Sequence, residues 1–101
     1  MISRIWHGWT SRENADAYEA FLRSEMLPSI HDVPGYLGAT LLRRESDGDI
    51  EFVTITRFES LAAVRAFAGE NYERAVVRAE AERLLARFDE RSAHYATVLD
   101  G

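Results

Sequence analysis

The chain has 101 residues, of which 47% are hydrophobic and 29% are charged. This length and balance predict a single globular domain over residues 1–101, large enough to bury a hydrophobic core. Its 12 basic and 17 acidic residues give a net charge of −5, which argues against a nucleic-acid partner because phosphate binding needs clustered Lys and Arg. The lack of cysteine excludes disulfides, cysteine-ligated metal sites and a thiol nucleophile.

Hydropathy gives no sign of a membrane partner. No stretch approaches the roughly 18 consecutive apolar residues that a membrane span requires. Residues 1–4 open directly into an alternating pattern and lack the apolar core of a signal peptide. We therefore expect a cytoplasmic protein.

The first expected element is a strand over residues 2–9, where large side chains alternate between two faces. Thr10 and Glu13 have the spacing of a capping box, which predicts that a helix begins after Thr10. Apolar residues then recur at steps of three and four, and the helix is expected to end before Pro28. The alternation of the strand places Ile5, His7 and Trp9 on one face and Ile2, Arg4 and Trp6 on the other.

A β-hairpin is the clearest local prediction. Residues 36–45 and 50–58 are rich in β-branched and aromatic side chains, and the loop between them contains an Asp-Gly step. Alternation places Val53 and Ile55 opposite Phe52 and Phe58, so both faces of the hairpin need cover. It likewise separates Leu37, Ala39 and Leu41 from Tyr36, Thr40 and Leu42.

Two helices and a strand are expected after the hairpin. Ser60 is a plausible cap for a short helix that Gly69 closes, followed by a loop over 69–72. Residues 73–88 have helical periodicity and predict a second helix, and residues 92–99 predict a last strand.

The resulting order, βαββαβ, favours the ferredoxin-like arrangement, a four-stranded antiparallel sheet with its helices on one face. The other face would leave a contiguous apolar patch of roughly several hundred Å² in water, more than a soluble monomer usually shows. A second copy of the sheet is the simplest cover, so we expect a homodimer packed sheet to sheet.

Five stretches of the chain resemble the antibiotic biosynthesis monooxygenase-like family of the dimeric α+β barrel superfamily. They are residues 2–8, Val33-Pro34-Gly35-Tyr36, residues 52–60, Ala66-Phe67-Ala68-Gly69 and His94-Tyr95. The resemblance implies a pocket between sheet and helices. It further implies a cofactor-independent monooxygenase whose aromatic or polyketide-type substrate gives its own electrons to O2, without flavin, metal or nicotinamide. The alternative is a non-catalytic dimeric barrel protein with structural histidines.

The chain departs from this family pattern at three places. Phe58 stands where haem-degrading and quinone-forming relatives tend to carry a tryptophan, so an indole N–H donor is lost. Residues 66–69 lack the iron-binding histidine that haem-degrading relatives carry in this region, which argues against haem. Where those relatives have a first-strand asparagine, this chain has Ile5 or His7.

His7 and His94 are the candidate catalytic residues, because a histidine facing the pocket can act as a base or a donor. His7 is expected to face the helices if Phe58 does. The alternative for His94 is a hydrogen-bonded structural group or, less in keeping with the sequence, a metal ligand. His31 is expected on the surface.

Aromatic side chains are the candidates for substrate binding, because flat rings with a few polar groups are typical of small-molecule pockets. Core packing explains such residues equally well. The chain has no phosphate-binding glycine loop, no histidine pair at metal-ligand spacing and no Gly-x-Ser-x-Gly motif, so no metal or cofactor is expected. The candidate substrate-binding residues are Trp9, Phe58, Phe67 and Tyr72.

Overall fold

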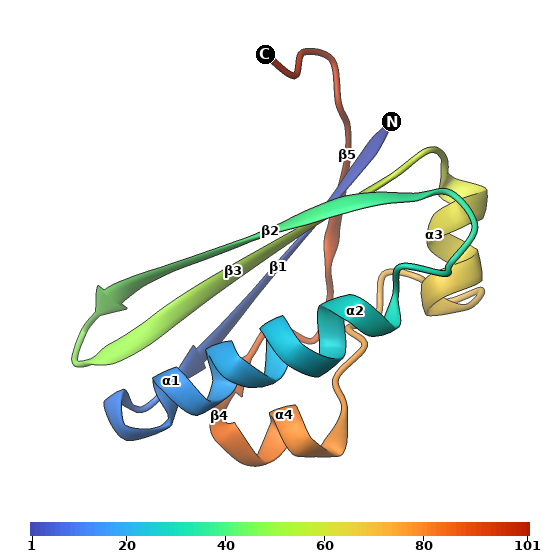
Figure 1. Cartoon of the computed structure of the whole chain (residues 1–101). Helices are drawn as coiled ribbons and strands as arrows, with labels where there is room; N and C mark the ends of the chain where they lie inside the picture. Colours follow the sequence, from blue (N-terminus) through green and yellow to red (C-terminus); the bar gives the residue numbers. More distant parts are fainter.

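A computed structural model describes all residues from Met1 to Gly101 and shows an antiparallel sheet with its helices on one side (Figure 1). The strand order is β2-β3-β1, and the other edge of β1 is shared by β4 and β5. None of the helices is both long enough and apolar enough to span a bilayer. In chain order the elements are β1 (Ile2–Thr10), α1 (Arg12–Phe21), the π-helical turn η1 (Leu22–Met26), α2 (Leu27–Ser29), β2 (Tyr36–Ser46), β3 (Asp49–Phe58), α3 (Leu61–Ala68), α4 (Ala79–Leu84), β4 (Leu85–Phe88) and β5 (Ala93–Ala96).

The expected hairpin is confirmed as β2 and β3. Its turn is tighter than predicted, because Ser46 pairs with Asp49 and only Asp47 and Gly48 lie between the strands. Both have positive φ, 51° and 86°, as the favoured two-residue hairpin turn requires.

The predicted faces of β2 are wrong at its start, because the register shifts between Tyr36 and Gly38. Tyr36 lies opposite Phe58, whereas Ala39 lies opposite Thr56, so Tyr36 and Ala39 both face the helices. The extra residue of a β-bulge reverses the side-chain alternation on one side of it, which the sequence pattern alone does not reveal.

The first helix begins one residue later than predicted. Ser11, not Thr10, is its N-cap, and its hydroxyl accepts a hydrogen bond from the backbone N–H of Asn14. Thr10 Oγ1 instead donates to the Ser11 carbonyl. A side-chain acceptor at this position satisfies one of the free N–H groups of the first turn.

The predicted helix end before Pro28 is also wrong, because the helical run continues to Ser29. In a regular α-helix the proline ring would crowd the carbonyl four residues earlier. The π-helical turn η1 lies directly before this point, and in it the N–H of Leu27 donates to the carbonyl of Leu22. This wider turn accommodates Pro28 within the helical run.

The prediction of one helix over residues 73–88 is wrong. Only α4 is helical, whereas Leu85–Phe88 form β4 and pair with the end of β1. The Trp6 ring packs against Phe88, and its indole N–H donates to the Asp89 carbonyl at 2.6 Å. These contacts with distant residues outweigh a helical preference worth only tenths of a kcal/mol per residue.

The last strand is shorter than the predicted 92–99. β5 covers four residues and pairs with the start of β1, so β4 and β5 together occupy the fourth strand position. Beyond it Val98 and Leu99 are 93% and 87% exposed, and the tail runs away from the sheet (Figure 1).

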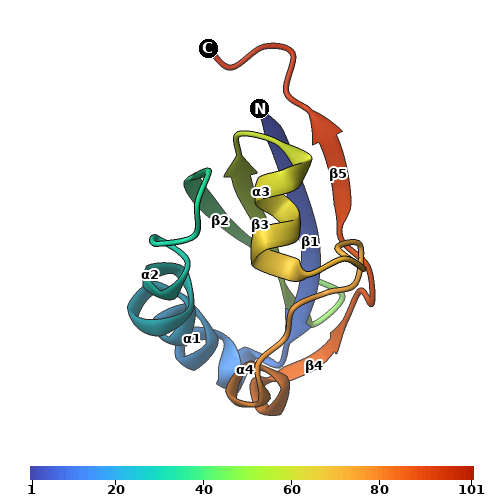
Figure 2. The same ribbon diagram turned by 90° about the vertical axis from the view of Figure 1, so that its right-hand side faces the viewer.

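The core lies between the sheet and the helices in two clusters. In the larger one the rings of Tyr18 and Phe52 meet edge to face, with centroids 4.8 Å apart. The smaller one joins Phe58 to α3, which covers one end of the sheet (Figure 2). Each large side chain buried in this way contributes about 2–3 kcal/mol to folding.

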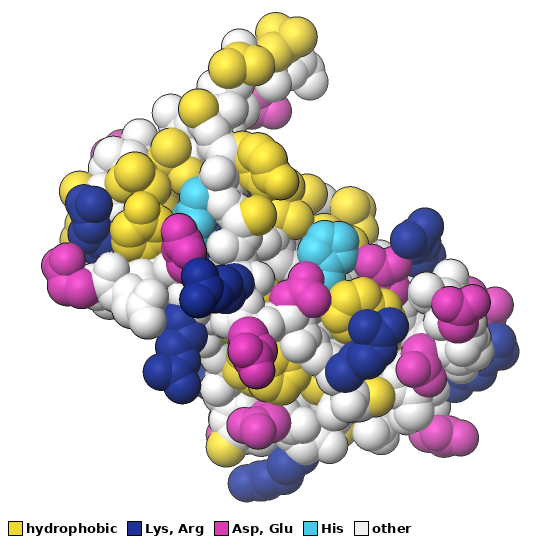
Figure 3. Space-filling model, turned by 180° about the vertical axis from the view of Figure 1, so that it is seen from behind, with side chains coloured by type: hydrophobic (Ala, Val, Ile, Leu, Met, Phe, Trp, Pro, Cys, Tyr) yellow, Lys and Arg dark blue, Asp and Glu magenta, His cyan; other side chains and the backbone are white.

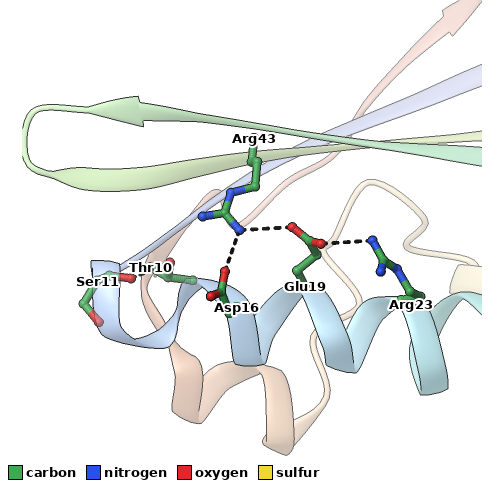
Figure 4. Close-up of polar contacts among 6 residues, drawn as sticks. All are labelled: Thr10, Ser11, Asp16, Glu19, Arg23 and Arg43. Carbon is green, nitrogen blue, oxygen red and sulfur yellow. Dashed lines mark hydrogen bonds and ion pairs between the residues drawn. The ribbon is translucent and has the colours of Figure 1, made fainter.

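An ion-pair network fastens α1 to the edge strand β2 (Figure 4). Arg43 Nη1 donates to Asp16 Oδ1 and Glu19 Oε1, and Glu19 also accepts from Arg23. The Arg43 guanidinium lies over the Phe52 ring, 5.4 Å from its centroid. Because the network is exposed, each pair adds about 1 kcal/mol at most.

Gly35 lies in the loop between α2 and β2 and provides a test of the close contact of this loop with α3. Its φ is +84°, and a Cβ there would lie 2.5 Å from the Cβ of Ala63. We expect Gly35→Ala to lower the free energy of unfolding by about 2–5 kcal/mol, because backbone strain and overpacking add. Urea denaturation measures this loss.

Gly48→Ala is the matched control. Gly48 has nearly the same φ, +86°, but nothing lies within 4 Å of its added Cβ. It should cost about 1–2 kcal/mol, the strain alone. Equal losses for the two variants would contradict the close contact with α3.

Candidate functional site

The pairing of β1 with β3 assigns their side chains to the two faces of the sheet. Arg4 lies opposite Thr56 and Trp6 lies opposite Thr54, and all of these residues face the helices. The residues of β1 that alternate with Arg4 and Trp6, including His7, face the other way. We call this other side the open face, because no helix covers it (Figures 1 and 2).

A cavity of about 60 Å³ lies between the sheet and the helices. Its walls come from the middle of β1 and β3, from α1, η1 and α4, and from the segment between α3 and α4. Most of its lining is apolar and aromatic, with few polar groups among them. The principal lining residues are Trp6, Phe21, Leu22, Met26, Phe67 and Val77.

Arg4 is the charged group in the sheet wall of this cavity, and it is only 4% exposed. Its guanidinium donates to the backbone carbonyls of Tyr72 and Arg74, which belong to the segment between α3 and α4. It also lies over the Phe67 ring, 5.5 Å from the centroid. Burial lowers the pKa of Arg4 to about 10, so it remains a cation at neutral pH.

His94 completes the surroundings of Arg4. Its Nε2 lies 3.0 Å from Arg4 Nη1. Because a guanidinium only donates, Nε2 must accept, and the ring is therefore neutral with its proton on Nδ1. Burial, and next the charge of Arg4, lower the pKa of His94, while Glu73 opposes the shift.

Thr54 is the second polar group of note in the cavity wall. Its Oγ1 atom is buried and has no hydrogen-bond partner. A buried hydroxyl without a partner costs about 1–3 kcal/mol, so such atoms are uncommon in folded proteins.

The candidate site residues do not converge. Phe67 lines the cavity, and Tyr72 contributes its carbonyl to Arg4 and its ring edge to His94, at 5.0 Å between centroids. Phe58 is fully buried in the smaller core cluster, where it packs against Phe67 rather than lining the cavity.

The expectation that His7 shares a face with Phe58 is wrong. Phe58 lies opposite Ile2, whereas His7 lies opposite Val53 on the open face. Trp9 is on the open face too, since it is an even number of residues from His7. Both residues are therefore outside the cavity.

The open face carries a polar network of its own. The Glu51 carboxylate accepts from Arg44 Nε at 2.6 Å and lies 2.9 Å from His7 Nδ1, and these contacts lower the pKa of Glu51. The Trp9 ring lies beneath the Arg87 guanidinium, 3.8 Å from its centroid. Figure 3, which views the molecule from behind, shows histidine and charged side chains interspersed with apolar ones.

The chain offers few groups to hold a metal or haem. No group of three or more His, Cys, Asp or Glu side chains is placed to bind a metal ion. Residues 66–69, where the family resemblance would require an iron ligand, end α3 with the Phe67 ring packed on Phe58. Residues 66–69 therefore supply no iron ligand.

Sequence reasoning missed Arg4 and Thr54, two of the polar residues that line the cavity. A signal was present for Arg4, since it is the one charged residue on the Ile2–Arg4–Trp6 face of an otherwise apolar strand pattern. Nothing in the sequence distinguishes Thr54 from the other threonines of β3.

Comparisons with known proteins identify relatives. The family model described as Antibiotic biosynthesis monooxygenase matches residues 1–79. Among solved structures, Rv0793 from Mycobacterium tuberculosis has 20% identity and a TM-score of 0.68, covering 98% of this chain and 96% of that one. A structure described as an antibiotic biosynthesis monooxygenase has 22% identity and a TM-score of 0.67, covering 98% and 100%.

The heme-degrader MhuD from Mycobacterium tuberculosis, solved with two hemes bound in its active site, is also similar. It has 21% identity and a TM-score of 0.65, covering 100% of this chain and 99% of that one. No curated protein matches the chain. The structural likenesses confirm the expected α+β ferredoxin-like fold with an antiparallel sheet.

The pH dependence of stability tests the state of His94. Its pKa in the fold lies below the ordinary value of 6.5, so the unfolded chain binds more protons than the folded chain as pH falls below that value. This contribution to the free energy of unfolding is complete above about pH 6.5 and is lost as pH falls. Urea denaturation between pH 8 and pH 5 measures it.

His94→Gln removes this titration but keeps a polar side chain, while His7 and His31 are common to both proteins. We expect the wild type to lose more stability than the variant over this range. Parallel curves would contradict a neutral His94 bound to Arg4.

Proposed function

Because this chain belongs to the antibiotic biosynthesis monooxygenase family of the dimeric α+β barrel superfamily, we propose that it binds an aromatic or polyketide-type small molecule and oxidises it with O2. The observation that carries the proposal is the apolar cavity between sheet and helices, with the rings of Trp6, Phe21 and Phe67 in its walls. Such walls with few polar groups are typical of small-molecule sites. The proposal includes no flavin, metal or nicotinamide.

The size of the cavity sets a condition on binding. At about 60 Å³ it is smaller than the roughly 300 Å³ or more of sites for drug-sized ligands. The wall formed by residues 69–78 has no helix or strand, and it contributes Val76, Val77 and Arg78. We propose that this segment moves outward to admit a ligand of more than one ring. Arg4 would then help to hold this segment in its closed position, since the guanidinium donates to two carbonyls of the segment.

The chemistry would begin with removal of a proton from the substrate, because an aromatic anion gives an electron to O2 more readily than the neutral molecule does. His94 is the proposed base: it does not itself line the cavity, but it contacts Arg4, which does. A neutral imidazole can accept a proton, but its Nε2 is engaged by Arg4 in this structure. A ligand that takes over the Arg4 Nη1 hydrogen bond would free Nε2 for this role.

A second candidate function is binding without turnover. One observation favours it: a ring nitrogen of His7 contacts Glu51 and one of His94 contacts Arg4, as in purely structural histidines. Catalysis requires one of these contacts to be exchanged for a contact with substrate. Binding alone does not.

Oxygen consumption distinguishes the two functions. With a panel of anthrone-like and hydroquinone substrates, we expect uptake of O2 by the wild type and a rate about a hundredfold lower for His94→Gln, because a positioned base is lost. His31→Gln is the matched control, since His31 is exposed and contacts neither the cavity nor Arg4. Ligand binding without oxygen uptake by any panel member would favour the binding function.

We further propose that a second copy of the chain covers the open face. Leu42 on this face is 49% exposed and lies opposite Val53, and Thr40 lies opposite Ile55. Ile55 in turn lies opposite Ile5. Leu42, Val53, Ile55 and Ile5 form an apolar row on the open face. Burial of this apolar row against a second sheet would remove apolar surface from water.

Ile55→Asp tests the dimer. An unpaired charge buried in the contact would cost several kcal/mol, so sedimentation should show a shift from dimer to monomer. Ala20→Asp adds the same charge to the exposed surface of α1 and should leave the assembly unchanged. A dimeric Ile55→Asp variant with unaltered thermal stability would contradict the sheet-to-sheet contact.

A further inference from the structure

The charge of Arg4 is not balanced by any carboxylate of the chain. Arg4 takes part in none of the ion pairs, all of which lie elsewhere. Its contacts are two backbone carbonyls and a neutral imidazole, which carry no net charge. A charged side chain that is almost fully buried is normally paired, because burial of an isolated charge is expensive.

Two N–H groups of the Arg4 guanidinium have no hydrogen-bond partner in the chain. A guanidinium has five N–H groups, and three are accounted for by Tyr72, Arg74 and His94. The remaining two include Nε–H, because all three hydrogen bonds come from Nη1 and Nη2. Donors left over in a cavity wall can bind oxygen atoms of a ligand, and a charged donor binds an anionic oxygen more strongly than a neutral one.

Thr54 is an independent observation that points to the same cavity. Its unpartnered, buried Oγ1 and the Arg4 guanidinium both line it. Arg4 lies opposite Thr56 and Thr54 is two residues from Thr56 on the same strand face. This diagonal relation is within the reach of a long side chain, so both groups can contact one ligand.

We propose that the ligand of this cavity carries an anionic oxygen group, of which a carboxylate is the simplest, bound by the free N–H groups of Arg4 and the Thr54 hydroxyl. This inference rests on the proposed function and adds the chemical class of the ligand to it. The apolar walls, which include Phe21 of α1 and Phe67 of α3, then receive the rest of the molecule. Binding supplies the missing negative charge beside Arg4 and a partner for Thr54.

Benzoate and benzamide are matched probes, since they have one ring and similar size but differ in charge. With calorimetry on the full chain, we expect benzoate to bind at least about tenfold more tightly than benzamide, as for hydrogen bonds to a charged group. The Arg4 Nε–H resonance, followed by NMR, should shift with benzoate and not with benzamide.

Two variants test the assigned groups. Arg4→Lys keeps the charge but loses the additional N–H donors, and should weaken benzoate binding at least about tenfold. Because this variant also loses hydrogen bonds that hold residues 69–78, Thr54→Val gives a second test that leaves those bonds in place. It should remain folded and weaken benzoate binding about three- to tenfold, with no effect on benzamide.

Thr40→Val is the control, the same substitution on the open face, and should change neither affinity. Equal affinities for benzoate and benzamide would overturn the anionic class while leaving aromatic binding intact. Benzoate binding that is insensitive to Thr54→Val, with no shift of the Arg4 resonance, would overturn the assigned site. Binding of neither probe would overturn this inference, whereas the proposed function is decided separately by oxygen uptake with the substrate panel.

Discussion

The register between β1 and β3 is the constraint on which the rest of the molecule depends. The two strands pair along the whole of β1, from Ile2 opposite Phe58 to Thr10 opposite Ile50. Because side chains alternate between faces, a slip of one residue would exchange the helix side for the open face. The same pairing buries Phe52 and Phe58 under the helices and brings Arg4 to the cavity.

Arg4 links this register to the least regular part of the chain. The segment between α3 and α4 has no helix or strand beyond an isolated bridge between Arg74 and Arg91, and the guanidinium supplies donors to two of its carbonyls. A single buried cation thus holds this segment against the sheet and is the charged group in the sheet wall of the cavity. A buried cation costs free energy unless its contacts repay it, and an apolar residue here would lose both hydrogen bonds.

The two faces of the sheet have distinct chemical characters. The cavity on the helix side is lined mainly by apolar and aromatic side chains, and its polar residues are Arg4, Arg78, Ser92 and two threonines of β3. The open face combines an apolar row with the Glu51 network, whose carboxylate is held ionised by Arg44 and His7. A second sheet could cover this face only if its polar groups stayed paired. Glu51, Arg44 and His7 already pair with one another within one chain.

The sequence by itself determined the first strand and helix, the hairpin and the α+β ferredoxin-like class, because these follow from local periodicity and turn chemistry. Only the tertiary structure decided the rest. The bulge after Tyr36 changed the faces of β2, pairing with β1 turned Leu85–Phe88 from expected helix into strand, and the β1–β3 register moved His7 and Trp9 away from the cavity. Each depends on contacts between residues far apart in the chain. Neither the solitary charge of Arg4 nor the unpartnered hydroxyl of Thr54 could be recognised before the surrounding residues were in place, because the lack of a partner is a property of the packed structure.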